Sequence, residues 1–114
     1  MKQAILDTNF IITCVNQKID FLEEINLRGI LPLIPKEVIQ ELKNNNLELA
    51  ISILKKENKL FKEISLGKGH VDKKIIEYAK KNPEVIVGTL DQEIKKSIKN
   101  PKAVITERKR ISIL

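Results

Sequence analysis

Two short apolar segments of this chain each lead to an aspartate, and this arrangement limits the fold more than any other feature. Ile5 and Leu6 directly precede Asp7, and the apolar run that begins at Val85 leads to Asp91. Apolar runs this short, each followed by a helical pattern, are typical of buried parallel strands. Open α/β sheets bind their ligands at the carboxyl ends of such strands. We therefore expect both carboxylates to lie at one functional edge of a parallel sheet.

The hydrophobic pattern alternates strands and helices along the whole chain. This alternation favours an α/β fold, a three-layer α/β/α sandwich with a central, mainly parallel sheet, in one domain of residues 1–114. The predicted strands are residues 3–6, 30–34, 85–87, 103–106 and 111–113, and residues 61–66 are either a strand or an extended lead-in. The predicted helices are residues 9–18, 20–27, 36–43, 47–60, 71–81 and 92–99.

Two further acids fall at the borders of predicted helices. Asp72 is followed three, four and seven residues later by apolar side chains, so it lies on or beside an apolar stripe. Glu41 comes three residues after Val38, at the border of the buried face of its helix, whereas Glu37 is free to face solvent. The chain thus has four acids at strand ends or helix borders that one doubly wound sheet can bring together.

Each of these acids also has an ordinary structural interpretation. Asp7, Asp72 and Asp91 stand where they can cap the N-termini of helices. Thr89 begins a capping-box pattern of its own, and Glu41 taken alone reads as a solvated helix edge. The local sequence leaves these alternatives open.

A cluster of carboxylates needs a counter-charge. Two of them repel each other by about 4 kcal/mol at 4 Å, even with an effective dielectric constant of 20. Hard oxygen ligands suit Mg²⁺ or Mn²⁺, and the lack of a His and Cys cluster argues against zinc. We therefore expect a divalent cation at the converging acids.

Composition narrows the classes of partner. Twenty-one Lys and Arg against fifteen Asp and Glu leave a net charge of +6, which favours nucleic acid first and an anionic membrane second. The sequence shows neither an apolar stretch long enough to span a membrane nor a secretory signal, so we expect a cytoplasmic protein. The lone cysteine, Cys14, lies in an apolar helical pattern and is expected to pack in the core.

Four segments resemble the four motifs of the PIN domain, in the order found in that family and across nearly the whole chain. They are Ile5-Leu6-Asp7-Thr8-Asn9, Pro35 to Leu42, Asp72 to Ala79, and Thr89-Leu90-Asp91. PIN domains are small α/β/α ribonucleases. The resemblance implies that Mg²⁺ or Mn²⁺ is held by an acidic quartet, and that polar residues accompany its first and last members. The quartet is Asp7, Glu41, Asp72 and Asp91, and the accompanying residues are Asn9 and Thr89.

The resemblance also implies a function. The segment from Val104 to Ile111 is similar to the tail of small archaeal members related to ribosomal RNA processing nucleases, and the same fold serves as the toxin in VapC-type toxin–antitoxin pairs. We therefore expect a metal-dependent endoribonuclease whose partner is RNA, and an antitoxin or a second copy of the chain as a protein partner. Basic residues near the motifs and in the tail are expected to contact the RNA backbone. These residues are Lys68, Lys73, Arg108, Lys109 and Arg110.

Three other functions remain open. A noncatalytic RNA-binding scaffold in ribosome assembly would bind RNA without metal, although a scaffold has no need of four clustered acids. A haloacid dehalogenase-like phosphatase would carry a second acid two residues after Asp7, where this chain has Asn9. A receiver-like interaction module is disfavoured by the basic charge and by the residues around Asp91.

Overall fold

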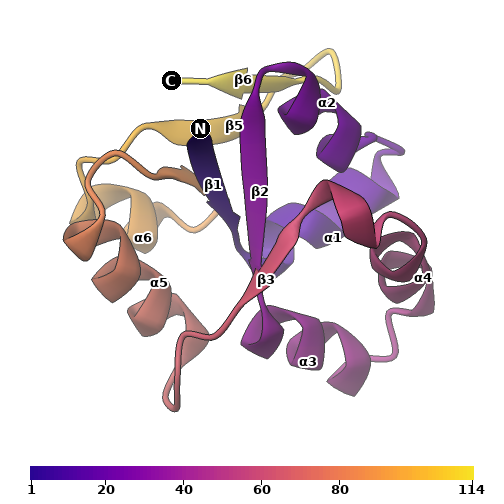
Figure 1. Cartoon of the computed structure of the whole chain (residues 1–114), viewed down its shortest axis with the longest axis horizontal. Helices are drawn as coiled ribbons and strands as arrows, with labels where there is room; N and C mark the ends of the chain where they lie inside the picture. Colours follow the sequence, from indigo (N-terminus) through magenta and orange to yellow (C-terminus); the bar gives the residue numbers. More distant parts are fainter.

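The computed structural model describes residues 1–114, and its strands form one six-stranded sheet in the order β3-β2-β1-β4-β5-β6. Neighbouring strands run parallel except for β6, which is antiparallel to β5. Figure 1 shows the sheet between two groups of helices. The predicted α/β/α sandwich with a mainly parallel sheet is therefore confirmed. The strands are β1 (Lys2–Leu6), β2 (Ile30–Pro35), β3 (Lys62–Ile64), β4 (Ile86–Gly88), β5 (Lys102–Ile105) and β6 (Ile111–Ile113).

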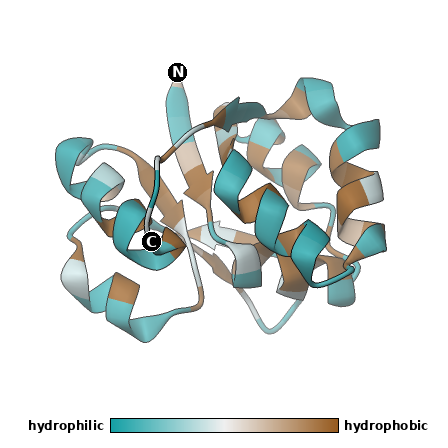
Figure 2. Cartoon of the chain, turned by 90° about the horizontal axis from the view of Figure 1, so that it is seen from below, coloured by the Kyte–Doolittle hydropathy of each residue, from teal (hydrophilic) through white to brown (hydrophobic).

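The helices cover the two faces of the sheet unequally. Four of them pack on one face, namely α1 (Thr8–Asn16), α2 (Phe21–Leu27), α3 (Lys36–Asn44) and α4 (Glu48–Lys56). The other face is covered by α5 (Val71–Lys81) and α6 (Gln92–Ser97). In Figure 2 the strands at the centre are mostly hydrophobic, whereas the surrounding helices carry both hydrophilic and hydrophobic residues. None of the helices combines the length and hydropathy needed to cross a bilayer.

The central strand β1 supplies side chains to both cores. Ala4 and Leu6 point into the core beneath α1 to α4, and Ile5 points into the core beneath α5 and α6. All three are fully buried, because β1 is covered on both faces and paired on both edges. This double burial explains why the strand reads as a continuous apolar run rather than an alternating one.

The connections after β1 and β4 leave the sheet toward opposite faces. β1 leads into α1 on one face, whereas the neighbouring strand β4 leads toward α6 on the other. A crevice opens at the carboxyl ends of two adjacent strands with this arrangement. The fold therefore places a binding crevice beside Asp7, which directly follows β1.

Some predicted element boundaries differ from the structure. The helix predicted for residues 47–60 ends at Lys56, and a separate 3₁₀ turn covers Asn58–Leu60. The helix predicted for residues 92–99 ends at Ser97, because Ile98 adopts an extended backbone and packs into the core beneath α5 and α6. Residues 61–66, left open as a strand or a lead-in, contain the short edge strand β3. Cys14 is buried in the core, as predicted.

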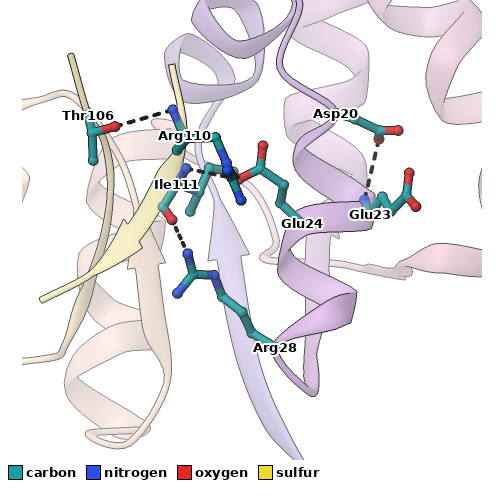
Figure 3. Close-up of polar contacts among 7 residues, drawn as sticks. All are labelled: Asp20, Glu23, Glu24, Arg28, Thr106, Arg110 and Ile111. Carbon is teal, nitrogen blue, oxygen red and sulfur yellow. Dashed lines mark hydrogen bonds and ion pairs between the residues drawn. The ribbon is translucent and has the colours of Figure 1, made fainter. Parts of the chain in front are cut away.

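Side chains at helix α2 form hydrogen bonds to β6, the edge strand of the C-terminal β5–β6 hairpin. Figure 3 shows the Glu24 carboxylate accepting hydrogen bonds from the Arg110 side chain and the Ile111 backbone N–H, both at 3.1 Å. The Arg28 guanidinium donates to the Ile111 carbonyl oxygen. An edge strand normally leaves such backbone groups unpaired. Here α2 provides the partners that a further strand would otherwise supply.

One buried amide joins the end of α5 to the start of β4. The Asn100 side chain is 4% exposed, and its Nδ2 donates to the carbonyl oxygens of Ala79, Asn82 and Val85 at 2.9 to 3.0 Å. Those carbonyls lie at the turn between the helix and the strand, where regular backbone pairing stops. The Ala79 and Asn82 carbonyls also accept the backbone N–H groups of Asn82 and Val85, so the Asn100 amide adds a second donor to these two and a donor to the Val85 carbonyl.

We expect Asn100→Ala to lower the free energy of unfolding by about 1 to 3 kcal/mol, because it removes a buried amide that donates to three carbonyl oxygens at this turn. Urea denaturation measures this change. Asn58→Ala removes the same side chain from an exposed position and should change stability by less than about 0.5 kcal/mol. Equal stability of the two variants would contradict the role assigned to Asn100.

Candidate active site

A polar cavity of about 470 Å³ lies at the carboxyl ends of the central strands. Its lining comes from four separate parts of the chain: the β1–α1 junction, helix α3 with the turn after it, the first turn of α5, and the segment before α6. All four acids singled out from the sequence are among the lining residues. The complete lining is Asp7, Thr8, Asn9, Ile12, Glu41, Asn45, Leu47, Val71, Asp72 and Asp91.

Asp7 is the most tightly held of these acids. Its backbone N–H donates to the Gly88 carbonyl of β4 at 2.9 Å, which fixes the residue between the two strands. One carboxylate oxygen accepts the Thr8 backbone N–H at 2.8 Å and so caps α1. The other accepts the Thr89 hydroxyl at 3.0 Å. The residue as a whole is only 7% exposed. Helix capping and a place in the cavity are therefore compatible for Asp7.

Thr89 links the first and last acids of the set. Its fully buried hydroxyl donates to Asp7 and accepts the Asp91 backbone N–H at 3.1 Å. The N-cap of α6 is Asp91, which accepts the Glu93 N–H at 2.8 Å. The capping box considered for Thr89 is therefore not formed, because this hydroxyl contacts Asp7 across the sheet.

The side chains of Leu6 and Phe10 pack closely over Gly88, the last residue of β4. A Cβ atom at this position would lie 2.8 Å from Leu6 Cδ2 and 3.4 Å from the Phe10 ring. The missing side chain lets the two strands and α1 pack closely around the residue that precedes Thr89.

Glu41 is held in the cavity by a residue that the sequence analysis did not single out. The Thr8 hydroxyl donates a hydrogen bond to Glu41 Oε1. Glu41 is half-buried, so it is not the solvated helix edge that its sequence alone suggested. The only sequence signal for Thr8 was its place directly after Asp7, because the contact spans two helices that are distant in the chain.

Asp72 and Asn9 form the open side of the cavity. Both side chains are exposed, and both line the cavity. The N-cap position of α5 is His70, so Asp72 is not the cap of its helix. Asp72 therefore lies beside the apolar stripe of α5, with its carboxylate available from solvent.

The electrostatics of the cavity are dominated by uncompensated negative charge. Burial raises the pKa of Asp7 above 3.8, and the charges of Glu41 and Asp72 raise it further, against the opposing hydrogen bonds from Thr8 and Thr89. The two ion pairs in the structure, Lys74–Glu77 and Arg110–Glu24, involve none of the four acids. No basic side chain neutralises this cluster, although the protein carries a net charge of +6.

The carboxylate oxygens of the cavity suit a hard divalent cation, but the side chains do not converge on a single metal position. No group of three His, Cys, Asp or Glu side chains is arranged so that it could hold a metal ion. Carboxylate oxygens are the ligands that Mg²⁺ and Mn²⁺ prefer. Asp72 is exposed, so its carboxylate can rotate toward Asp7, which is fixed. Asp91 is half-exposed, and one of its carboxylate oxygens caps α6.

The basic residues expected to contact RNA lie in two places. Lys68 and Lys73 are exposed, and in the sequence they flank Val71 and Asp72, the two residues of α5 that line the cavity. Arg108, Lys109 and Arg110 occupy the turn between β5 and β6, outside the lining, and Arg110 pairs with Glu24. Contact with RNA stays a prediction for both groups.

We expect the pKa of Asp7 to make stability depend on pH in metal-free protein. Because this pKa is raised on folding, ionisation favours the unfolded chain, and the free energy of unfolding falls as pH rises above 3.8 and through the raised pKa. Asp7→Asn removes the ionisable group. The free energy of unfolding of the variant should therefore rise relative to that of the wild type as pH increases from 3.8 through the raised pKa of Asp7. Urea denaturation in chelator from about pH 3 to about pH 7 measures it. A difference that is constant over the window would contradict the assignment.

Comparison with known proteins identifies the family. No protein-family model matches the chain. Ribonuclease VapC4 of Methanocaldococcus jannaschii is 31% identical in an alignment that covers 99% of this chain and 97% of that protein. The structure of the PIN domain endonuclease Utp24 superposes with a TM-score of 0.81 at 27% identity, covering 98% of this chain and 92% of the other. The motifs, the sheet order and these near full-length similarities together show that the chain belongs to the PIN-domain ribonuclease family.

Proposed function

We propose that this protein is a divalent-metal-dependent endoribonuclease that hydrolyses RNA phosphodiester bonds. The observation that carries the proposal is that four carboxylates, none of them in an ion pair, line one polar cavity in a chain of net charge +6. Such a cavity attracts cations, and the basic remainder of the chain attracts a polyanion. Similarity to proteins described as a ribonuclease and as an endonuclease supports the same reaction class.

The four acids would have different roles in binding Mg²⁺ or Mn²⁺. Asp7 and Asp91 approach from adjacent strands and share the contact to Thr89, so we assign them to a central ion. Asp72 would serve a shared or second ion, and Glu41 would be a ligand or orient a water. Bound Mg²⁺ or Mn²⁺ supplies a water of lowered pKa and stabilises the leaving oxygen.

Hydroxyl and amide groups around the acids would hold them in place. The Thr89 hydroxyl donates to one Asp7 oxygen and so keeps it oriented. The Thr8 hydroxyl orients one oxygen of Glu41 in the same way. Such supporting partners tune metal affinity as well as geometry. Asn9 is exposed in the lining, where its amide can contact a phosphate oxygen or a metal-bound water.

Recognition of RNA would rest on its backbone rather than on its bases. Lys68 and Lys73 stand near Asp72, where they can contact phosphates on either side of the scissile bond. The aromatic side chains are few, and Phe10 and Phe21 are buried in the core. Stacking of bases on aromatic rings therefore has little support in this chain.

The same hydrolytic site would serve either of two cellular roles. One is ribosomal RNA processing, and the other is the toxin of a toxin–antitoxin pair, which the similarity to Ribonuclease VapC4 favours. A toxin should arrest the growth of a host that expresses it alone, and a small antitoxin should restore growth and copurify with it. A processing enzyme should leave growth unaffected.

We expect RNA cleavage with Mn²⁺ or Mg²⁺ to stop in chelator and to fall by more than about 100-fold in Asp7→Asn, because a fixed ligand of the cation is lost. A gel assay on single-stranded RNA measures this. Asp20→Asn is the matched control, because Asp20 is also an N-cap aspartate but lies outside the cavity. It should cleave like the wild type.

Two results would contradict the proposed mechanism. Cleavage that persists in chelator would exclude dependence on a divalent metal, and full cleavage by Asp7→Asn would remove Asp7 from the site. RNA binding without any cleavage, unchanged by chelator, would instead favour the noncatalytic scaffold.

A further inference from the structure

The segment between β3 and α5 is a six-residue loop that ends at the cavity. It runs from Ser65 to His70, and the next two residues, Val71 and Asp72, are part of the cavity lining. The loop contains Gly67 and Gly69, both with positive φ angles, and most of its residues are exposed. Two glycines in so short an exposed loop give it little intrinsic rigidity. Its conformation must therefore be held by contacts with the rest of the protein.

The Glu37 carboxylate provides such a contact at the start of the loop. Its Oε1 accepts the Leu66 N–H at 3.0 Å, and its Oε2 accepts the Gly67 N–H and the Ser65 hydroxyl at 3.3 Å each. Both oxygens are thus used by three consecutive residues of the loop. This corrects the expectation that Glu37 is free to face solvent. The sequence could not show the contact, because the partners are about thirty residues apart in the chain.

The charge of Glu37 is favoured where it lies. Partial burial opposes ionisation, but hydrogen bonds from Leu66, from its own N–H, from Gly67 and from Ser65 together lower the pKa of Glu37 below 4.5. The residue also stands in the first turn of α3, where a negative charge is favourable. The anchor is therefore a carboxylate at neutral pH, and hydrogen bonds to a charged acceptor are stronger than neutral ones.

The other end of the loop rests on α5. A Cβ atom at Gly69 would lie 3.0 Å from the aliphatic stem of Lys74, so this side chain packs directly against the glycine. Lys74 is itself held by an ion pair to Glu77 at 3.3 Å. Between its two fixed ends the loop presents Lys68 and His70 to solvent, next to Asp72.

We infer that Glu37 is a positioning residue that holds the Ser65–His70 loop as one wall of the RNA-binding surface. The inference rests on the proposed function, because it takes RNA as the ligand of the cavity. Glu37 touches neither the cavity nor the other acids, so it acts only through the loop that it anchors. Loss of the anchor should weaken RNA binding while the four acids stay in place.

The loss of a negative charge at Glu37 and the loss of loop anchoring should change RNA affinity in opposite directions, so the two effects can be told apart. Replacing a glutamate by glutamine removes one negative charge, and this should tighten the binding of RNA. Glu63→Gln is the matched control, because Glu63 is exposed and lines the same surface depression as Glu37, whereas the side-chain hydrogen bonds to the loop all come from Glu37. Weaker RNA binding by Glu37→Gln than by this control, together with faster exchange of the loop amides, therefore reports the loss of loop anchoring and not the loss of a charge.

The experiment measures RNA affinity by fluorescence anisotropy in chelator, where no cleavage occurs, together with amide hydrogen exchange by NMR. Glu37→Gln should bind single-stranded RNA about tenfold more weakly than Glu63→Gln, and the Leu66 and Gly67 amides should exchange at least about tenfold faster. Ser65→Ala removes one donor and keeps Glu37, so it should shift both measurements less and in the same direction.

The outcomes separate this inference from the proposed function. Equal or tighter RNA binding by Glu37→Gln, or unchanged exchange at Leu66 and Gly67, would overturn the inference. Wild-type protein that fails to bind RNA would overturn it as well. If the wild type binds RNA and never cleaves it, the proposed nuclease fails, while the positioning role stands on the affinity and exchange data.

Discussion

The burial of the Asp7 carboxylate without a positive partner is the constraint on which the site depends. Burial and two neighbouring acids raise its pKa, and no ion pair relieves it. The burial of an unpaired carboxylate costs stability, although the chain carries 21 Lys and Arg that could have paired with it. An uncompensated charge at the carboxyl ends of parallel strands is instead characteristic of a functional site.

The surrounding structure holds this unfavourable charge in place. Asp7 is tied to β4 through the Gly88 carbonyl, to α1 through its capping contact, and to the segment before α6 through Thr89. The same Thr89 hydroxyl receives the backbone N–H of Asp91. Two of the acids are therefore fixed by one small hydrogen-bonded unit, whereas Asp72 is left exposed and adjustable. Such a site is preorganised at its base and open toward the substrate.

The sequence predicted the fold from local signatures, and it predicted the four acids from their positions taken as a set together with the resemblance to the PIN domain. Apolar runs of strand length mark the sheet, and each acid sits at a strand end or helix border that the pattern defines. The contacts of Thr8 with Glu41, of Glu37 with the Ser65–Gly67 segment and of Asn100 with the turn before β4 have no such signature. Each joins residues separated by fifteen or more positions, so it exists only after the helices have packed. The end of α6 was missed for the same reason, because core packing of Ile98 outweighed its helical spacing.

The most direct test of the account is the binding of Mn²⁺ to the metal-free protein, followed by the electron paramagnetic resonance signal of the free ion. The account predicts saturable binding by the wild type and by Asp20→Asn, and binding weaker by more than about tenfold in Asp7→Asn. Absence of binding in the wild type, or equal binding by Asp7→Asn, would contradict the claim that the buried charge of Asp7 is there to hold a cation.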